Sequence, residues 1–121
     1  KGLGAVHSMS HALGANQDLR LHHGTLNGVI LPTILRFNKD HVGNKYSKIA
    51  RAMGKDNSVD LADEIEALNK TIGLPGGLAE MGVTEDMIPG LVNHSMTDPS
   101  NATTPRLPSQ GEWEKLFLDS M

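Results

Sequence analysis

The sequence contains no cysteine, which excludes disulfide bonds, thiolate metal sites and cysteine nucleophiles. Aromatic residues are also scarce at 3% of the chain, so aliphatic side chains and methionine must build most of the core. No apolar run approaches the roughly 20 residues that cross a bilayer, and no signal peptide is evident. The net charge of -3 comes without a basic block, which argues against a nucleic-acid partner. We therefore expect one small cytoplasmic domain that binds neither membrane nor nucleic acid.

Helical periodicity is present along the whole chain, and no sustained period-two alternation indicates a strand. The expected helices cover Gly4 to Leu13, Gly24 or Thr25 to Phe37, Asn44 to Met53, Ser58 to Thr71, Thr84 to His94, and a last segment that begins at Ser109. The sequence therefore predicts an all-α fold, a helical bundle.

Some residues in these segments are expected to break a helix or to cap its start. Pro32 lies inside the second expected helix and should kink it or weaken one turn. Ser58 is expected to cap the fourth helix, and Ser109 with Glu112 forms a capping box at the start of the last. Thr97 to Leu107 is expected to be a polar linker, exposed or draped over the surface.

The start of the sequence is unusual. Lys1 is not an initiator methionine, and residues 2–6 are typical of the middle of a helix, with no capping residue before them. We therefore expect the chain to be a piece of a longer polypeptide.

Four of the six histidines lie between Val6 and Gly24. His7 and His11 are four residues apart in an expected helix, so both imidazoles project from one face. His22 and His23 follow where a second helix begins. Two imidazoles at this spacing, with a third from another element, can surround a divalent transition metal.

Ordinary structural histidines are the competing interpretation. An HxxxH spacing arises easily by chance, and no Asp or Glu is obvious beside this one. The small residues around the pair favour a site, because they allow another backbone or a cofactor to approach closely. His41 and His94 are expected to be ordinary side chains. The residue pattern by itself leaves both interpretations open.

Longer blocks of sequence resemble the iron-containing alcohol dehydrogenase family, specifically its C-terminal helical domain, which has the dehydroquinate synthase-like fold. The blocks are GLGAVHSMSHALGA, HHGTLNGVILPTILRFN, GLPGGLAEMGVTEDMIPGLV and DPSNATTPRLPSQGEWEKLFLDSM. The first two are the specific ones, and together the four cover essentially the whole chain. The resemblance implies that residues 1–121 form a C-terminal, all-helical, metal-binding domain.

The resemblance also implies roles for the histidines. In the family, one Asp and three His hold a divalent metal, usually iron and sometimes zinc. His7 and His23 are the implied ligands, while His11 is implied to lie beside metal, nicotinamide and substrate, as a candidate for proton relay. The loop between His11 and His23 is longer than is typical of this family, so either His22 or His23 could be the ligand. We favour His23 because it directly precedes Gly24.

The other two ligands and the family's N-terminal nucleotide-binding α/β domain have no counterpart in this chain. The resemblance therefore implies that a full-length parent, expected to be a homo-oligomer, transfers hydride reversibly between a small alcohol or aldehyde and NAD(P). The 121-residue chain alone is expected to be inactive. The alternative is a stand-alone helical module for metal binding or dimerisation.

Overall fold

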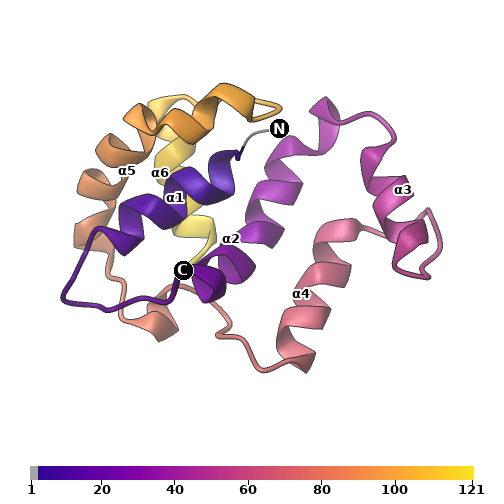
Figure 1. The fold of residues 1–121 in the computed structure, drawn as a ribbon, viewed down its shortest axis with the longest axis horizontal. Coiled ribbons are helices and arrows are strands. Elements are labelled where there is room, and N and C mark those ends of the chain that lie inside the picture. Colours follow the sequence, from indigo (N-terminus) through magenta and orange to yellow (C-terminus); the bar gives the residue numbers. More distant parts are fainter. Residues whose placement is uncertain (1–2) are drawn as a thin grey trace.

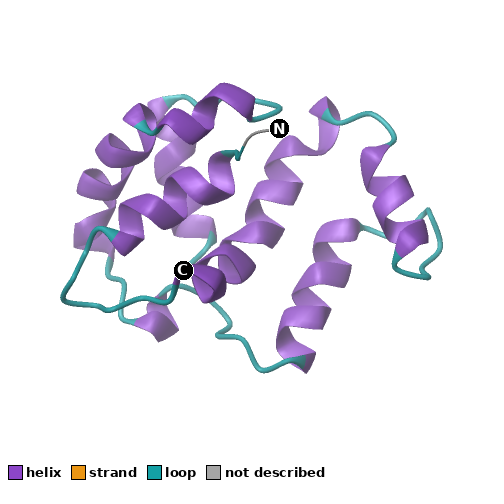
Figure 2. Ribbon diagram, in the orientation of Figure 1, coloured by secondary structure: helices purple, strands orange, loops and turns teal. Residues whose placement is uncertain are grey.

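The structure, a computed structural model, describes residues 3–121 and consists of helices joined by short connections (Figures 1 and 2). Its α-helices are α1 (Ala5–Gly14), α2 (His23–Asn38), α3 (Lys45–Ala52), α4 (Leu61–Thr71), α5 (Ile88–Thr97) and α6 (Gln110–Asp119). Short 3-10 helices are η1 (Lys39–His41), η2 (Ala79–Met81), η3 (Glu85–Met87) and η4 (Pro99–Thr103). Residues 3–121 contain no strand, so the predicted all-α fold is confirmed.

Helix α2 runs through the middle of the molecule (Figure 1). On one side, α1 packs against both α2 and α5, and α5 packs against α6. On the other side, α4 packs against α2, and α3 packs against α4. The turn η4 also packs against α1, although it lies far along the chain from that helix. The helix that carries His7 and His11 is therefore held from several directions.

The main core lies between α1, α2, α5 and α6. Two of the few aromatic residues, Trp113 and Phe117, lie on one face of α6 and are fully buried in this core. The aliphatic and methionine side chains around them include Met9, Leu13, Leu26, Ile30, Ile88 and Val92. Burial of these apolar surfaces supplies the main driving force for folding. It also fixes α1 and α2 side by side, with their polar faces turned toward each other at one end.

The first helix begins later than the sequence indicated. Gly4 has an extended backbone and stands at the N-cap position, so α1 begins at Ala5. Residues 3 and 4 therefore precede the helix and do not lie in the middle of one, contrary to the prediction. Residue 2 lies outside the described residues. The Cα of Gly4 faces Thr104, so the neighbouring segment fills the space next to the helix end.

The cap of the fourth helix was predicted wrongly. Asp60, not Ser58, is the N-cap of α4, and its carboxylate accepts a hydrogen bond from the backbone N–H of Ala62. Both the backbone N–H and the hydroxyl of Ser58 donate to Asp56 instead. A local side-chain turn of this kind competes with helix capping. By contrast, the predicted capping box at the start of α6 is present.

The proline in α2 does not end the helix, which continues from His23 to Asn38. Pro32 has no N–H to donate to the carbonyl four residues earlier, that of Gly28. The side-chain amide of Asn69, on α4, donates to this carbonyl at 2.7 Å. Tertiary packing therefore replaces the helical hydrogen bond that proline removes.

The segment expected to be a surface linker is exposed over much of its length, but part of it is folded. After α5 ends at Thr97, residues 99–103 form η4, and both Asp98 and Ser100 are buried. The carboxylate of Asp98 accepts a hydrogen bond from the backbone N–H of Ser100 and caps the turn. The polar composition of this segment thus serves local hydrogen bonding against α1.

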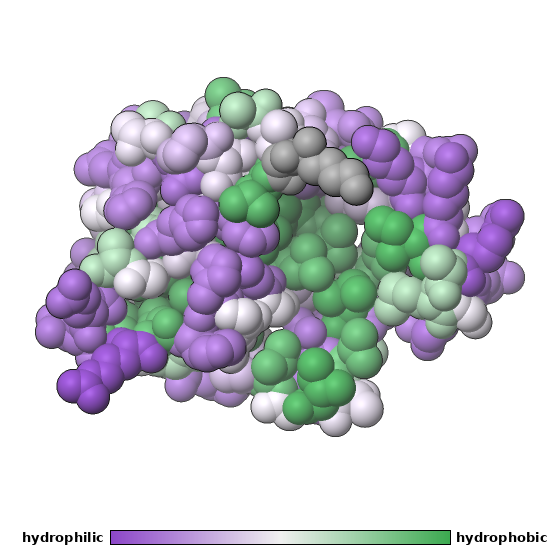
Figure 3. Space-filling model, in the orientation of Figure 1, coloured by the Kyte–Doolittle hydropathy of each residue, from purple (hydrophilic) through white to green (hydrophobic). Residues whose placement is uncertain are grey.

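Half of the large apolar side chains that are exposed in the described chain lie away from this core. In Figure 3 they gather over the part of the molecule formed by α3 and α4, where Ile49, Met53, Leu68 and Ile72 are exposed. Among residues 3–121, no helix combines the length and the hydropathy that a membrane span requires.

Candidate metal centre

Three histidine rings meet where α1 passes the start of α2. His7 and His11 project from α1, and His23 is the first residue of α2. The ring centres of His7 and His23 are 5.3 Å apart, those of His11 and His23 are 5.6 Å apart, and those of His7 and His11 are 5.8 Å apart. The structure therefore brings together the three histidines that the sequence analysis singled out.

The Nε2 atoms of two of these rings converge on one amide. The side-chain nitrogen of Asn27 lies 3.1 Å from Nε2 of His23 and 3.5 Å from Nε2 of His7. The side-chain oxygen of Asn27 is buried and has no hydrogen-bond partner. The nitrogen of this amide thus lies between two ring nitrogens, while its oxygen is left without a partner. Sequence reasoning did not identify Asn27 as part of a site, although its place four residues after His23 puts both on one helical face.

The opposite nitrogen of His23 is oriented by α1. Its Nδ1 lies 3.0 Å from the hydroxyl of Ser10, which is completely buried. Metal-binding histidines are typically fixed in this way, with the second ring nitrogen hydrogen-bonded so that the first presents its lone pair. The contact with Ser10 is therefore the arrangement that a ligand at Nε2 needs.

His11 has a partner that the sequence did not reveal. Its Nδ1 lies 2.9 Å from a carboxylate oxygen of Asp98. Burial alone would raise the pKa of Asp98, but the hydrogen bonds from Ser100 and His11 outweigh burial and lower that pKa below its ordinary value. The DPSN motif indicates a capped turn, but no local pattern relates it to a helix so distant in sequence. Only the tertiary fold places this carboxylate beside the histidines.

The environment of His7 favours a neutral ring. Burial is the largest cause that lowers the pKa of His7, and nearby His23 and His11 lower it further by repulsion. Asp98 acts in the opposite direction but does not reverse the shift. Neutral imidazole is the form that coordinates metals, so the surroundings of His7 favour the protonation state that a ligand requires.

The other histidines play different parts. His22 is the N-cap of α2, and its Nδ1 accepts a hydrogen bond from the backbone N–H of Thr25 at 3.4 Å. His41 and His94 are exposed and lie on other elements. Of the two candidates that the sequence left open, the structure places His23 in the cluster and uses His22 to cap the helix.

The donor set in this chain is incomplete. Within residues 3–121, no three His, Asp or Glu side chains are arranged to hold a metal ion together. The lowered pKa of His7, the contact of His23 with Ser10 and the unpaired side-chain oxygen of Asn27 fit a group bound at Nε2 of His7 and His23. Ligands from elsewhere would have to complete the coordination sphere of a transition metal.

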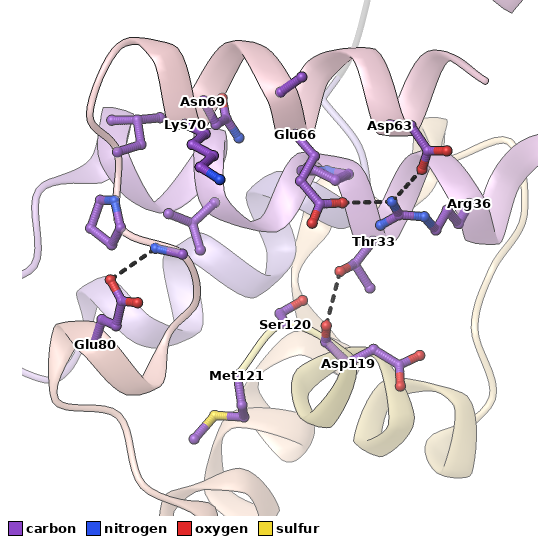
Figure 4. Close-up of a pocket in the computed structure, with 16 residues that line it drawn as sticks. Thr33, Arg36, Asp63, Glu66, Asn69, Lys70, Glu80, Asp119, Ser120 and Met121 are labelled. Atoms are coloured by element: carbon purple, nitrogen blue, oxygen red, sulfur yellow. Dashed lines mark hydrogen bonds and ion pairs between the residues drawn. The ribbon is translucent and has the colours of Figure 1, made fainter. Parts of the chain in front are cut away.

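A large cavity in the described chain is separate from the histidines. It has a volume of about 790 Å³ and lies between α2, α4 and the end of α6 (Figure 4). At one end Arg36 forms ion pairs with Asp63 and Glu66, and at the other Glu80 accepts a hydrogen bond from the backbone N–H of Gly76. Its charged groups are therefore largely engaged with one another, and no histidine lines it.

Comparison with known proteins gives the same fold and a family. A model of the Fe-containing alcohol dehydrogenase family, C-terminal part, matches residues 1–121. The 4-hydroxybutyrate dehydrogenase of Cupriavidus necator is 40% identical over 128 residues, which cover 100% of this chain and 34% of that protein. A crystal structure of 1,3-propanediol oxidoreductase aligns with a TM-score of 0.89 at 31% identity, over 98% of this chain and 33% of the other.

A structure of sulfoacetaldehyde reductase from Bifidobacterium kashiwanohense, in complex with NAD+, aligns with a TM-score of 0.78 at 27% identity. That alignment covers 97% of this chain and 30% of the reductase. The chain thus spans about a third of the length of these relatives. A match over every residue, with a shared helical fold, shows that the chain belongs to the Fe-containing alcohol dehydrogenase family and corresponds to its C-terminal part.

Proposed function

We propose that this chain supplies part of the metal centre of an NAD(P)-dependent alcohol dehydrogenase, with His7 and His23 as ligands. The observation that carries the proposal is the convergence of two Nε2 atoms on the Asn27 amide, at 3.5 and 3.1 Å. Both imidazoles present Nε2, the atom that a metal would need. The hydroxyl of Ser10 contacts Nδ1, at the opposite edge of the His23 ring. Imidazole suits both Fe2+ and Zn2+. We propose one of these two as the metal, in keeping with the Fe-containing family to which the chain belongs.

A divalent metal held by His7 and His23 would supply Lewis-acid polarisation of an alcohol or aldehyde oxygen, and NAD(P) would supply or accept the hydride. Within this chain, His7 and His23 orient their lone pairs toward one point. His11 is the residue that moves a proton, since its ring lies beside both ligands without sharing the Asn27 contact. An imidazole titrates near neutral pH and is therefore suited to receive and release the hydroxyl proton. We also place His11 next to the nicotinamide.

The remaining parts of the enzyme lie outside this chain. Its incomplete donor set and its coverage of about a third of each relative support an N-terminal domain of the same polypeptide. That domain would supply the nucleotide site and the remaining ligands. The relatives are named for small hydroxy and aldehyde compounds, which supports a small alcohol or aldehyde as substrate. The 121-residue chain alone should then bind metal weakly and catalyse nothing.

Metal titration of the 121-residue chain tests the proposal. Co2+, whose absorption reports coordination, should bind weakly to the wild type. His7→Ala and His23→Ala should each weaken binding by about 10-fold or more. His94→Ala is the matched control, because His94 is exposed on α5, and it should leave binding unchanged. Equal losses in all three variants would contradict the assignment of ligands.

Sedimentation of the same samples separates the proposed function from a stand-alone module. A symmetric dimer could complete an incomplete donor set with histidines from two copies. If metal drives dimerisation and the binding tightens with protein concentration, the module is supported. Measured turnover of a short alcohol by the 121-residue chain with NAD and iron would overturn the statement that the chain alone is inactive.

A further inference from the structure

We propose that Asp98 is a positioning residue, which holds the ring of His11 in one orientation with the proton on Nδ1. The two side chains meet at 2.9 Å between Nδ1 and a carboxylate oxygen. The Asp98 side chain is only 6% exposed, whereas that of His11 is 38% exposed. A buried carboxylate therefore holds the inner edge of a ring that remains accessible from outside. The inference rests on the proposed function of His11, and the experiment below tests it separately from metal binding.

The carboxylate is fixed independently of the histidine. One of its oxygens accepts a hydrogen bond of 2.8 Å from the backbone N–H of Ser100, which leaves the other oxygen for His11. Asp98 precedes Pro99, whose ring restricts the backbone at the start of η4. The hydrogen bonds from Ser100 and His11 outweigh burial and lower the pKa of Asp98, so the carboxylate is ionised at neutral pH. An ionised carboxylate only accepts hydrogen bonds.

The turn that carries Asp98 is clamped to the helix that carries His11. The hydroxyl of Ser8 on α1 donates to the side-chain oxygen of Asn101 at 2.7 Å. The side-chain nitrogen of Asn101 donates to the carbonyl of Ser95 at 2.7 Å, and the hydroxyl of Ser95 donates to the carbonyl of Ser8. Ser8 and Ser95 are completely buried. This closed set of hydrogen bonds fixes η4 against α1 close to His11.

The contact with the Asp98 carboxylate determines which tautomer a neutral His11 ring adopts. Facing an acceptor, Nδ1 of His11 must carry the proton, and Nε2 is left with its lone pair. That is the form required of a group that receives a hydroxyl proton at Nε2. The rings of His11 and His23 also lie nearly parallel, at 14°. Without Asp98, the His11 ring would be free to turn and to carry its proton on either nitrogen.

Nitrogen-15 NMR of the imidazole rings tests this in the metal-free 121-residue chain, at a pH where the rings are neutral. The wild type should show His11 with Nδ1 protonated and Nε2 unprotonated. In Asp98→Asn the ratio of the two tautomers should move by about 10-fold toward the Nε2–H form, which corresponds to loss of a hydrogen bond to a charged group. Asp86→Asn, at an exposed carboxylate on η3, is the matched control and should leave the ratio unchanged.

Two further variants keep the test decisive. Asp98→Glu retains an acceptor and should restore part of the wild-type ratio. If Asp98→Asn fails to fold, Ser8→Ala loosens the clamp while retaining the carboxylate, and it should shift the ratio in the same direction by a smaller factor. A wild-type His11 with its proton on Nε2, or an unchanged ratio in a folded Asp98→Asn, would overturn the proposal. Neither result depends on whether His7 and His23 bind metal.

Discussion

The side-chain amide of Asn69 on α4 donates to the carbonyl of Gly28 on α2, at 2.7 Å. This carbonyl lacks its helical partner because Pro32 has no N–H to give. Asn69→Ala should therefore leave a carbonyl without a partner and lower the free energy of unfolding by about 1–2 kcal/mol, measured by urea denaturation. In a Pro32→Ala background the N–H returns, and the same substitution should cost clearly less. Equal costs in both backgrounds, as measured by this double-mutant cycle, would disprove the compensation.

Loss of the contact between Ser10 and His23 should weaken metal binding without removing a ligand. Ser10→Ala removes the hydroxyl that lies 3.0 Å from Nδ1 of His23 and leaves both proposed ligands in place. Metal binding should weaken by about 10-fold, as is typical when the partner of a ligating histidine is lost. Co2+ titration measures this change, and Ser47→Ala on α3 is the matched control. An unchanged Co2+ affinity in Ser10→Ala would show that the hydroxyl has no part in orienting the ring.

The two glycines Gly77 and Gly90 should respond in opposite directions to alanine. A methyl group at Gly77 would overlap the backbone oxygen of Met121, because the segment before η2 runs directly against the end of the described chain. The N–H of the next residue, Leu78, also donates to the carbonyl of Ser120 at 2.8 Å, which holds the two backbones together. Gly77→Ala should destabilise the fold by about 1–3 kcal/mol.

Gly90 lies in α5 and has open space where a Cβ would stand. Gly90→Ala should therefore stabilise the protein by up to about 1 kcal/mol, because alanine favours the helix. Thermal and urea denaturation of both variants measure the contrast. A stabilising Gly77→Ala would contradict the close backbone approach at Gly77, and a destabilising Gly90→Ala would contradict the open space at Gly90.

The cap of α4 predicts a dependence of stability on pH. The hydrogen bond from Lys39 is the largest cause that lowers the pKa of Asp60 below its ordinary value of 3.8. A carboxylate with a lowered pKa in the folded state stabilises it fully above the unfolded value and loses this effect as the pH falls through the folded value. Asp60→Ala should cost about 1 kcal/mol near neutral pH. It should cost much less at a pH well below 3.8.

Ser58→Ala is the matched control for that measurement, because the sequence had indicated Ser58 as the cap. Its hydroxyl bonds to Asp56 in an exposed turn, so its removal should change stability by less than about 0.5 kcal/mol. Urea denaturation at the two pH values compares the variants. A larger loss for Ser58→Ala than for Asp60→Ala would restore the sequence-based assignment.

Local patterns predicted most of the fold because they act over one or two helical turns. Apolar periodicity located the helices, and the serine–glutamate pair at Ser109 correctly marked the start of α6. Competition between nearby groups was harder to predict, since Asp60 and Ser58 are both good capping residues and only the turn at Asp56 separates their roles. The HxxxH spacing correctly placed His7 and His11 on one helical face.

The parts of the site that escaped prediction depend on contacts over long sequence distances. Asp98 lies 87 positions after His11, and its segment has the composition of a surface linker. Its burial follows from a clamp between Ser8, Ser95 and Asn101, and no residue pattern within a single element encodes that arrangement. The polar composition of residues 97–107 correctly indicated exposure for much of the segment, but not the burial of Asp98 and Ser100.

The separation of His11 and Asp98 along the chain also sets an order of events during synthesis. Helices α1 and α2 are translated before η4, and their three histidines can meet as soon as these neighbours pack. The carboxylate that restrains His11 is translated much later, and closing so long a loop makes its contact a slow, late step. We therefore expect the three histidine rings to come together first, and the ring of His11 to be held in one orientation only after η4 packs against α1.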